Sequence, residues 1–221
     1  MNSNLWETGP EPAIRVEGVG GDLRLYGWDN DQVSAEQDDV ASAGGSAGGA
    51  PLTLRAAGSC TLYVPRRASV TVDWVGGDGR VKNLEGPVDI RQVGGDLTLR
   101  ETGPVVIGRV GGDVKAEKVD GTLRLEMAGG DALVRGVAGD LALDQVGGDL
   151  SLHDVGGSVH ALARADARVH VDFAPGQDHE VQARGDLSCR LSPAASARVE
   201  IMARGDVSLN VPGSRVEGSG R

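Results

Sequence analysis

The feature that most constrains this chain is the tripeptide Gly-Gly-Asp, which recurs at a nearly fixed interval. After a first copy that ends at Asp22, five more copies end at Asp78, Asp96, Asp113, Asp131 and Asp149, and the intervals between these five are 18, 17, 18 and 18. Further turn residues, such as Gly86-Pro87 and Gly121-Thr122, lie half-way between them. Self-similarity at a short fixed period indicates a repeat architecture in which each unit stacks on its neighbours.

Each half of this repeat is a unit of about nine residues with apolar side chains at its first, third and sixth positions. Ten such units begin between residues 79 and 159, and 27 of their 30 apolar positions hold Val, Ile, Leu or Ala. The first-and-third spacing is the two-residue period of a strand that buries one face. Glycine makes up 35 of the 221 residues, and each interior glycine destabilises a helix by roughly 1 kcal/mol. The pattern therefore predicts strands and turns.

We predict an all-β chain that forms a single β-solenoid (a β-helix or β-roll). Its rungs have about 18 residues and consist of two nine-residue strand-turn units. The Gly-Gly-Asp tripeptides would stack along one edge, where glycine supplies the positive φ that tight corners need. The pattern favours a two-sided cross-section and leaves a three-sided one open. The one 17-residue repeat, short between Leu97 and Val105, predicts a bulge or a tightened corner.

The domain boundaries follow from this repeat. We expect an N-terminal segment at 1–13, the solenoid at 14–211 and a disordered tail at 212–221. Within the solenoid, residues 75–164 form the regular core, and 165–211 form longer rungs. Residues 29–51 are interpreted as a flexible insertion because they are first acidic and then rich in Gly, Ser and Ala. Five aromatic residues precede the regular repeat, and we interpret them as a cap over its open end: Trp6, Tyr26, Trp28, Tyr63 and Trp74.

Composition narrows the class of protein. The net charge of −10 disfavours non-specific nucleic-acid binding, and no apolar run is long enough to span a membrane. The start of the chain, 1–20, lacks the apolar core of a signal peptide, so a cytoplasmic location is expected, or the cell envelope if the chain is a fragment. Both cysteines, Cys60 and Cys189, fall at apolar strand positions and are predicted to be buried thiols.

The repeated G-G-D-[LV]-x-[LV] strands, the strand ending Leu62-Tyr63-Val64-Pro65 and the later G-D-[LV]-S segments resemble the bacterial "putative adhesin" family. The resemblance covers roughly residues 14–211. It implies a β-solenoid domain, and it supplies no catalytic residues. The bactofilins, which are polymer-forming cytoskeletal solenoids, are a more distant likeness with a similar rung length.

Two motifs have a structural and a functional interpretation. Stacked aspartates (Asp78, Asp96, Asp113, Asp131 and Asp149) would place carboxylates about 5 Å apart, either as turn residues or as a row of Ca²⁺ ligands. Arg-Gly-Asp occurs at 184–186 and 204–206, and the 20-residue spacing indicates a repeated corner. The chain lacks the G-x-x-x-x-G-K-[ST] and G-x-G-x-x-G phosphate-binding loops, so no cofactor and no catalytic residue is predicted.

The outward positions of the strands suggest how such a chain functions. Units that follow Gly-Gly-Asp direct a basic stripe outward, formed by Arg80, Lys82, Arg100, Lys115 and Arg135. Self-association is predicted on the opposite face or at the C-terminal end, through Val106, Ala142, Leu162, Val207 and Leu209. We therefore expect a non-catalytic structural or protein-interaction scaffold that binds a protein partner or itself. The alternatives are a binding module for an extended polyanion (a glycan or nucleic acid) and a bactofilin-like polymer.

Overall fold

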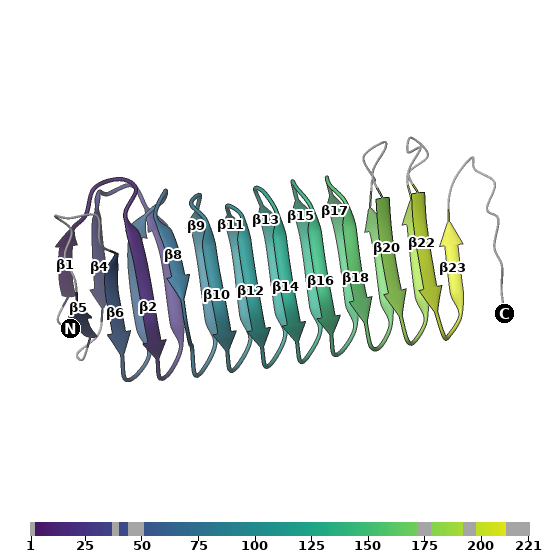
Figure 1. The fold of residues 1–221 in the computed structure, drawn as a ribbon, viewed down its shortest axis with the longest axis horizontal. Coiled ribbons are helices and arrows are strands. Elements are labelled where there is room, and N and C mark those ends of the chain that lie inside the picture. The colour runs from purple at the N-terminus through teal and green to yellow at the C-terminus, as the bar shows by residue number, and fades with distance from the viewer. Residues whose placement is uncertain (1–2, 37–39, 44–50, 172–177, 192–197, 211–221) are drawn as a thin grey trace.

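The computed structural model describes residues 3–36, 40–43, 51–171, 178–191 and 198–210, and its regular elements are all β-strands. The strands form two sheets of twelve and eleven strands, which we call sheet A and sheet B. Figure 1 shows an elongated stack in which the strands lie across the long axis. In the regular repeat, each turn of the chain adds one strand to each sheet. The predicted all-β solenoid is confirmed, and its cross-section has two sides.

Sheet A consists, in spatial order, of β1 (Ser3–Glu7), β4 (Gln32–Glu36), β7 (Cys60–Pro65), β3 (Leu23–Trp28), β9 (Gly79–Leu84), β11 (Leu97–Thr102), β13 (Val114–Val119), β15 (Ala132–Val137), β17 (Leu150–Val155), β19 (Ala167–Val171), β21 (Leu187–Leu191) and β23 (Val207–Asn210). Sheet B consists of β22 (Arg198–Ala203), β20 (Asp178–Ala183), β18 (Val159–Ala163), β16 (Leu141–Val146), β14 (Leu123–Ala128), β12 (Val105–Val110), β10 (Val88–Val93), β8 (Ser69–Val72), β2 (Ala13–Val19), β6 (Leu52–Ala56) and β5 (Val40–Ala43). Strands β1, β4 and β5 pair antiparallel, and the other strand pairings are parallel.

The core is a thin layer of side chains between the two sheets. In β11 the first, third and sixth residues are buried, and the sixth is Thr102 at an otherwise apolar position. Strict alternation would direct the fifth residue inward instead of the sixth. In the sheet A strands of the regular repeat, the fifth residue has a left-handed backbone, with φ of 54° at Glu101 and 57° at Lys118. In sheet A this conformation coincides with two consecutive outward side chains and the return of the sixth to the core, and β10 and β14 of sheet B show the same burial pattern without a positive φ.

The glycines of Gly-Gly-Asp serve a different purpose from the predicted one. The structure gives none of them a positive φ, so backbone handedness does not select glycine there. A Cβ added to Gly94 would lie 2.3 Å from the carbonyl oxygen of Gly76 in the preceding rung. The two rungs are held this close by hydrogen bonds such as the one from the amide of Gly94 to the carbonyl of Val75, at 2.8 Å. The corners need glycine because successive rungs approach each other closely.

The 17-residue repeat is a tightened corner. Strands β9 and β10 are joined by the three residues 85–87, whereas β11 and β12 are joined by Gly103 and Pro104 alone. Strands β10 and β12 remain in register from Val88–Val105 to Val93–Val110, so no residue bulges out of the ladder.

At the N-terminal end, the order of the rungs in space differs from their order in the sequence. Strand β3 pairs with both β7 and β9, so the β2–β3 rung lies between the β6–β7 and β8–β9 rungs (Figure 1). The predicted flexible insertion at 29–51 is wrong for 32–36 and 40–43, which form β4 and β5. Apolar residues alternate in β4, and its Val33 and Ala35 are fully buried. Strand β1 pairs with β4, so the sheet also includes part of the predicted N-terminal segment 1–13.

The predicted aromatic cap is also wrong for most of its members. Tyr26 and Trp28 alternate with the buried residues of β3 and stack against Tyr63 on the outer face of sheet A, with ring centroids 5.6 and 5.5 Å from that of Tyr63. Trp74 is exposed, and Trp6 packs against the core. The large rings therefore lie mainly outside the thin interior, and strand β4 covers the end of the core.

The last rungs are longer than the regular ones. The corner aspartates Asp166, Asp186 and Asp206 follow one another at 20-residue intervals and are joined by hydrogen bonds. Strands β19, β21 and β23 continue sheet A, while β18, β20 and β22 continue sheet B. The predicted tail at 212–221 lies outside the described residues.

Candidate functional site

The basic residues predicted to form a stripe lie on the outer face of sheet A. We call this set the basic face: Arg80 and Lys82 on β9, Arg100 on β11, Lys115 on β13 and Arg135 on β15. The strand register aligns Lys82 with Arg100, and Glu117 lies between Arg100 and Arg135 in the same column. The parallel ladder therefore brings together cations that belong to successive repeats of the sequence.

Glu117 is the acidic residue within this column. The Lys115 ammonium lies 3.0 Å from the Glu117 carboxylate, and their hydrogen bond is the main cause of a lowered Glu117 pKa. Within the part of the chain that the structure describes, the other four members of the basic face form no ion pair. Like charges in neighbouring strands destabilise a sheet, so an anionic ligand would relieve repulsion along this column.

The column of the basic face continues toward the C-terminus, and sequence reasoning missed its last members, His170 and Arg190. Arg135 aligns with His153, His153 with His170, and His170 with Arg190. The ring centroids of His153 and His170 are 5.8 Å apart. Along this column the residue number rises by 18, then by 17 and then by 20. Counting a fixed repeat therefore does not align β19 and β21 correctly.

The predicted row of aspartates forms a continuous hydrogen-bonded ladder along one corner. A carboxylate oxygen of Asp78 accepts the backbone N–H of Asp96 at 2.9 Å, and the same bond at 2.8 Å joins the next residues in the order Asp96, Asp113, Asp131 and Asp149. One oxygen of each of these carboxylates therefore bonds to the next rung. Among the described residues, no group of three or more His, Cys, Asp or Glu side chains is arranged to hold a metal ion.

Both Arg-Gly-Asp tripeptides belong to this same corner. The N–H of Asp186 donates to the Asp166 carboxylate, and the N–H of Asp206 donates to the Asp186 carboxylate, each at 2.8 Å. Asp166 in turn donates to Asp149, so the ladder of the regular repeat continues through these motifs. The Arg-Gly-Asp aspartates thus serve as corner residues.

The arginines of these two motifs, together with the arginine of Ala163-Arg164-Ala165-Asp166, form a second basic feature that the sequence analysis missed. Arg164, Arg184 and Arg204 follow strands β18, β20 and β22 at equivalent positions, and we call them the arginine row. A groove of about 500 Å³ runs beside them, with Leu162 and Met202 in its lining. Arg164 donates to the side chain of Gln145 at 3.2 Å. The available signal was the repeated Ala-Arg-x-Asp at 20-residue spacing.

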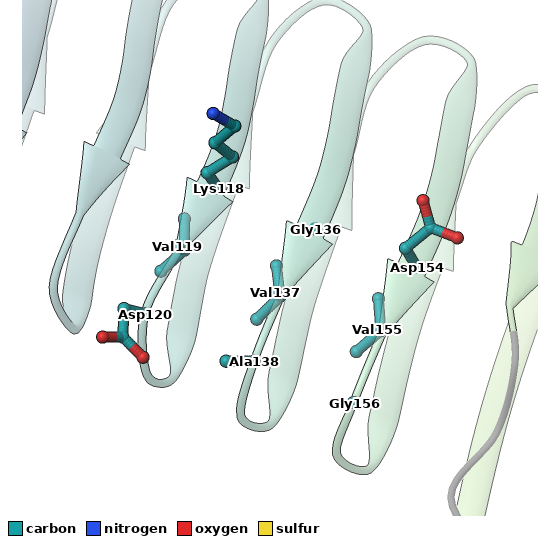
Figure 2. A pocket seen from close by; sticks show the side chains of 9 residues that line it. All are labelled: Lys118, Val119, Asp120, Gly136, Val137, Ala138, Asp154, Val155 and Gly156. Carbon is teal, nitrogen blue, oxygen red and sulfur yellow. The ribbon is translucent and has the colours of Figure 1, made fainter.

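A second shallow groove, of about 510 Å³, crosses the C-terminal ends of the sheet A strands β13, β15 and β17 (Figure 2). Figure 2 shows Lys118 and Asp154 from neighbouring strands on either side of Gly136, which has no side chain to fill the space between them. Its floor includes Val137 and Val155. The groove is open along its length, with Lys118 and Asp120 on one side and Asp154 on the other.

The residues predicted for self-association separate into two places. Val106, Ala142 and Leu162 lie at outward positions of β12, β16 and β18 on sheet B, and Val106 is 45 % exposed. Val207 and Leu209 lie on β23, the last strand of sheet A, at positions that point inward in β21. Val207 is 52 % exposed because no further rung covers it within the described residues.

The two cysteines are buried in the core, as predicted. Desolvation by burial raises the pKa of each thiol to about 11. Cysteine reacts as the thiolate, and a raised pKa keeps that form scarce at neutral pH. Cys60 and Cys189 therefore act as core residues.

Among the described residues, no helix has the length and apolar character needed to cross a bilayer. No protein-family model matches the chain, and no similar sequence is found among curated proteins. Among solved structures, the chain is similar to a crystal structure described as a putative adhesin from Bacteroides fragilis. The two are 13 % identical, with a TM-score of 0.36, and the match covers 95 % of this chain and 96 % of that one. No residue role is transferred from that structure.

Proposed function

We propose that this chain is a non-catalytic β-solenoid scaffold that presents its strand faces to a protein partner or to a second copy of itself. The observation that carries the proposal is the pair of continuous sheets, twelve and eleven strands long, around an interior filled by apolar side chains. Such a stack displays outward side chains in columns with a spacing of about 4.8 Å. Flat, regular faces of this kind suit contact with another protein surface. The resemblance to the "putative adhesin" family supports the solenoid fold and supplies no catalytic residue.

The ionisable groups support the non-catalytic part of the proposal. Active sites combine a cleft with groups whose pKa values are shifted toward a chemical task. The raised pKa values resolved here belong to the two buried thiols, and the lowered ones belong to Glu101, Glu117 and Asp140 at the surface. Neither the groove in Figure 2 nor the groove beside the arginine row is lined by any of these five groups. Glu101 lines a smaller hollow of about 260 Å³, and there its hydrogen bond with Lys118 is the main cause of its lowered pKa.

Mass in solution measured against protein concentration, with electron micrographs of the same samples, tests the self-association part. We expect the mass to rise with concentration below about 100 µM, where weak specific contacts form. Leu162→Glu should block association through a face, and Val207→Lys should block association through the end of the stack. Filaments that disappear with Val207→Lys would favour the bactofilin-like polymer. A wild-type chain that stays monomeric at about 100 µM, with the same elution as both variants, would contradict self-association.

The second candidate function is binding of an extended polyanion, such as a glycan or nucleic acid, through the basic face. It is favoured by the strand register that aligns Lys82, Arg100 and Arg135 in one column. A heparin column at low salt separates the two candidates, because only the second predicts retention of a chain with a net charge of −10. Under that function, Arg100→Glu with Arg135→Glu should abolish retention, and Arg91→Glu with Arg124→Glu on sheet B should not.

A further inference from the structure

The outer face of sheet B has an ordered charge pattern at its centre. Strand β10 directs Asp89 and Arg91 outward, and β14 directs Arg124 and Glu126 outward in the opposite order of sign. The register aligns Asp89 with Val106 and Val106 with Arg124. Between the two charged strands, β12 contributes the exposed Val106 and, beside it, a glycine. The four charges therefore lie at the corners of a rectangle, with like charges on the diagonals, and Val106 lies midway along the side that joins Asp89 to Arg124.

We propose that this face is a homodimer interface in which a second copy of the chain packs sheet B against sheet B, with the two solenoid axes antiparallel. The two-fold axis would run along β12. The proposal rests on the proposed scaffold function and names the partner of one face. A two-fold interface requires a surface that complements itself, and the pattern described above has this property.

The rotation about β12 places β10 of each copy on β14 of the other. Asp89 then faces Arg124 of the second copy, and Arg91 faces its Glu126. Each contact occurs twice by symmetry, which gives four ion pairs around the centre. Within one chain, Arg91 lies 3.0 Å from Asp73 and Arg124 lies 3.2 Å from Asp144. Among the described residues, the carboxylates of Asp89 and Glu126 have no cationic partner, and the second copy would supply one.

The exposed valine fits the same axis. Val106 is 45 % exposed and is the second residue of β12, the middle strand of sheet B. On the two-fold axis it would contact Val106 of the second copy and be covered by it. The neighbouring Gly108 has no side chain that would hold the two sheets apart. Val106 would then be buried between the two Asp89–Arg124 pairs, which is an apolar contact flanked by polar ones.

The size of the face is sufficient for a stable dimer. Strand β12 is the middle strand of the eleven in sheet B, so a rotation about it superimposes the two faces along their whole length. A six-residue strand covers about 95 Å² at a spacing of ~4.8 Å and a rise of ~3.3 Å per residue. The eleven strands therefore offer roughly 1,000 Å², compared with about 800 Å² per partner in a standard interface.

Two contacts oppose this arrangement. Asp73 would face Asp144 of the second copy, but each of these carboxylates is already paired with an arginine of its own chain. Arg109 would meet its own copy near the end of β12, where its side chain is exposed and can turn toward Glu126 of the second copy. A parallel dimer, with the axis along the stack, would instead oppose Asp89 to Arg91 and Val106 to Gly108. The experiments below distinguish the two arrangements.

Charge reversal tests the antiparallel pairing. Arg124→Asp should weaken the dimer at least tenfold, because it opposes two carboxylates twice per dimer. Asp89→Arg combined with Arg124→Asp should restore the wild-type dissociation constant, since the pair is then reversed. Loss of the internal Arg124–Asp144 ion pair alone would not be rescued by a change at Asp89. In a parallel dimer, the double variant would associate even more weakly than the single one.

Disulfide trapping tests the position of the axis. Val106→Cys should form disulfide-linked dimers rapidly in mild oxidant, because residue 106 lies opposite itself. Leu133→Cys, on the outer face of sheet A, is the matched control and should cross-link only slowly. The native thiols do not compete, because both are buried. Equal cross-linking of the two variants would overturn the dimer. If the chain associates but the double charge reversal does not rescue association, the dimer is overturned as well. Both outcomes leave the scaffold function standing. A strictly monomeric wild type would overturn both the dimer and self-association.

Discussion

At the scale of single residues, the most unusual position is the fifth residue of the sheet A strands. Asn83, Glu101, Lys118 and Asp154 all have φ between 54° and 57° there, and the fifth member of the row is Gly136 with φ of 71°. A residue with a side chain loses roughly 1 kcal/mol in this conformation. The conformation is specific to sheet A, because β10 and β14 of sheet B also return their sixth residue to the core and contain no residue with a positive φ. Polar side chains fill the position because it faces solvent.

Gly136 allows this strain to be measured. Gly136→Ala should lower the free energy of unfolding by about 1 kcal/mol, because alanine adopts a positive φ poorly. Steric overlap does not contribute, since an added Cβ would find no atom nearer than 3.7 Å. Gly136→Asn should lower it less, because asparagine visits this region readily. Urea unfolding of the three proteins gives the comparison, and an alanine variant as stable as the wild type would contradict this account.

The corners that lead from sheet A to sheet B lie opposite the Gly-Gly-Asp corners. One of them contains Asp140, a carboxylate with a defined pH response. The hydroxyl of Ser158, and then its backbone N–H, donate to the Asp140 carboxylate at 2.8 Å and lower the pKa of Asp140. A lowered pKa adds stability above the ordinary aspartate value of about 3.9, and this stability is lost as the pH falls through the folded-state pKa. Ser158→Ala removes the hydroxyl donor and retains the N–H.

We therefore expect Ser158→Ala to raise the Asp140 pKa part of the way to its ordinary value. The difference in stability between variant and wild type should be present near neutral pH and vanish in strong acid. An NMR titration of the Asp140 carboxyl carbon measures the shift directly. Ser151→Ala, which removes a hydroxyl from the outer face of sheet A, should leave the Asp140 titration unchanged. An unchanged pKa in Ser158→Ala would show that the backbone N–H alone stabilises the carboxylate.

At the scale of strands and corners, the shortened turn at Gly103-Pro104 allows a test of register. Insertion of Glu between Thr102 and Gly103 would recreate the three-residue corner Glu-Gly-Pro that already joins β9 to β10. We expect a change of less than about 0.5 kcal/mol in the free energy of unfolding, since the ladder on both sides stays in register and one added loop residue matters little. Chemical denaturation measures this difference.

The control is the same insertion within a strand. A Glu inserted between Thr98 and Leu99 shifts one part of β11 by a residue and exchanges its inner and outer faces. A polar or charged side chain then enters the core without a partner, which destabilises the fold by several kcal/mol. We expect this variant to lose its cooperative unfolding transition. Similar stability of the two insertions would contradict the register of the ladder.

Prediction from sequence succeeded where the repeat is regular. The first, third and sixth positions between residues 79 and 163 correctly identified the buried face, and the Gly-Gly-Asp spacing identified the stacked corner. The left-handed fifth residue was missed because its signal is mixed: Asn83, Gly136 and Asp154 are residue types that favour a positive φ, but Glu101 and Lys118 are not. The end of the basic face was missed because the rung length changes to 20 residues. The arginine row has a regular 20-residue spacing and was missed because its arginines were interpreted as ordinary polar strand residues.

The N-terminal rungs were missed for a different reason. Strand β4 lies in a segment whose composition is typical of a linker, and its burial depends on pairing with β7, which comes much later in the sequence. The β2–β3 rung is inserted between rungs that are formed later in the sequence. Long-range pairing of this kind is not encoded in local periodicity, so composition alone led to the wrong interpretation of residues 29–51.

At the scale of the whole molecule, the two ends of the stack are different. At the N-terminal end, β1 and β4 add two antiparallel strands to sheet A, and β5 adds one to sheet B (Figure 1). Short antiparallel strands at a sheet edge hinder the addition of another parallel rung. At the other end, β22 and β23 are the outermost described strands, and Val207 is exposed there. Any growth of the stack should therefore take place at the β22–β23 end.

Val33 provides the test of the N-terminal cap. This side chain is fully buried on β4 between β1 and β7. Val33→Asp places a carboxylate in the core without a partner, which opposes docking of β4 by several kcal/mol. The edge of the β6–β7 rung and its buried leucines, Leu54 and Leu62, would then be open to solvent and to other chains. We expect concentration-dependent aggregation, detected by light scattering and by binding of a hydrophobic dye.

Glu36→Gln is the matched control, because it changes the charge of an exposed residue on the same strand and leaves the buried face of β4 intact. It should remain as soluble as the wild type. Strands β7 and β3 separate β4 from the regular rungs in sheet A, so Val33→Asp should also retain most of its β-sheet circular dichroism while it aggregates. Loss of all β structure would instead mean that the cap is required for the solenoid to fold, and a soluble Val33→Asp variant would show that β4 does not protect the edge.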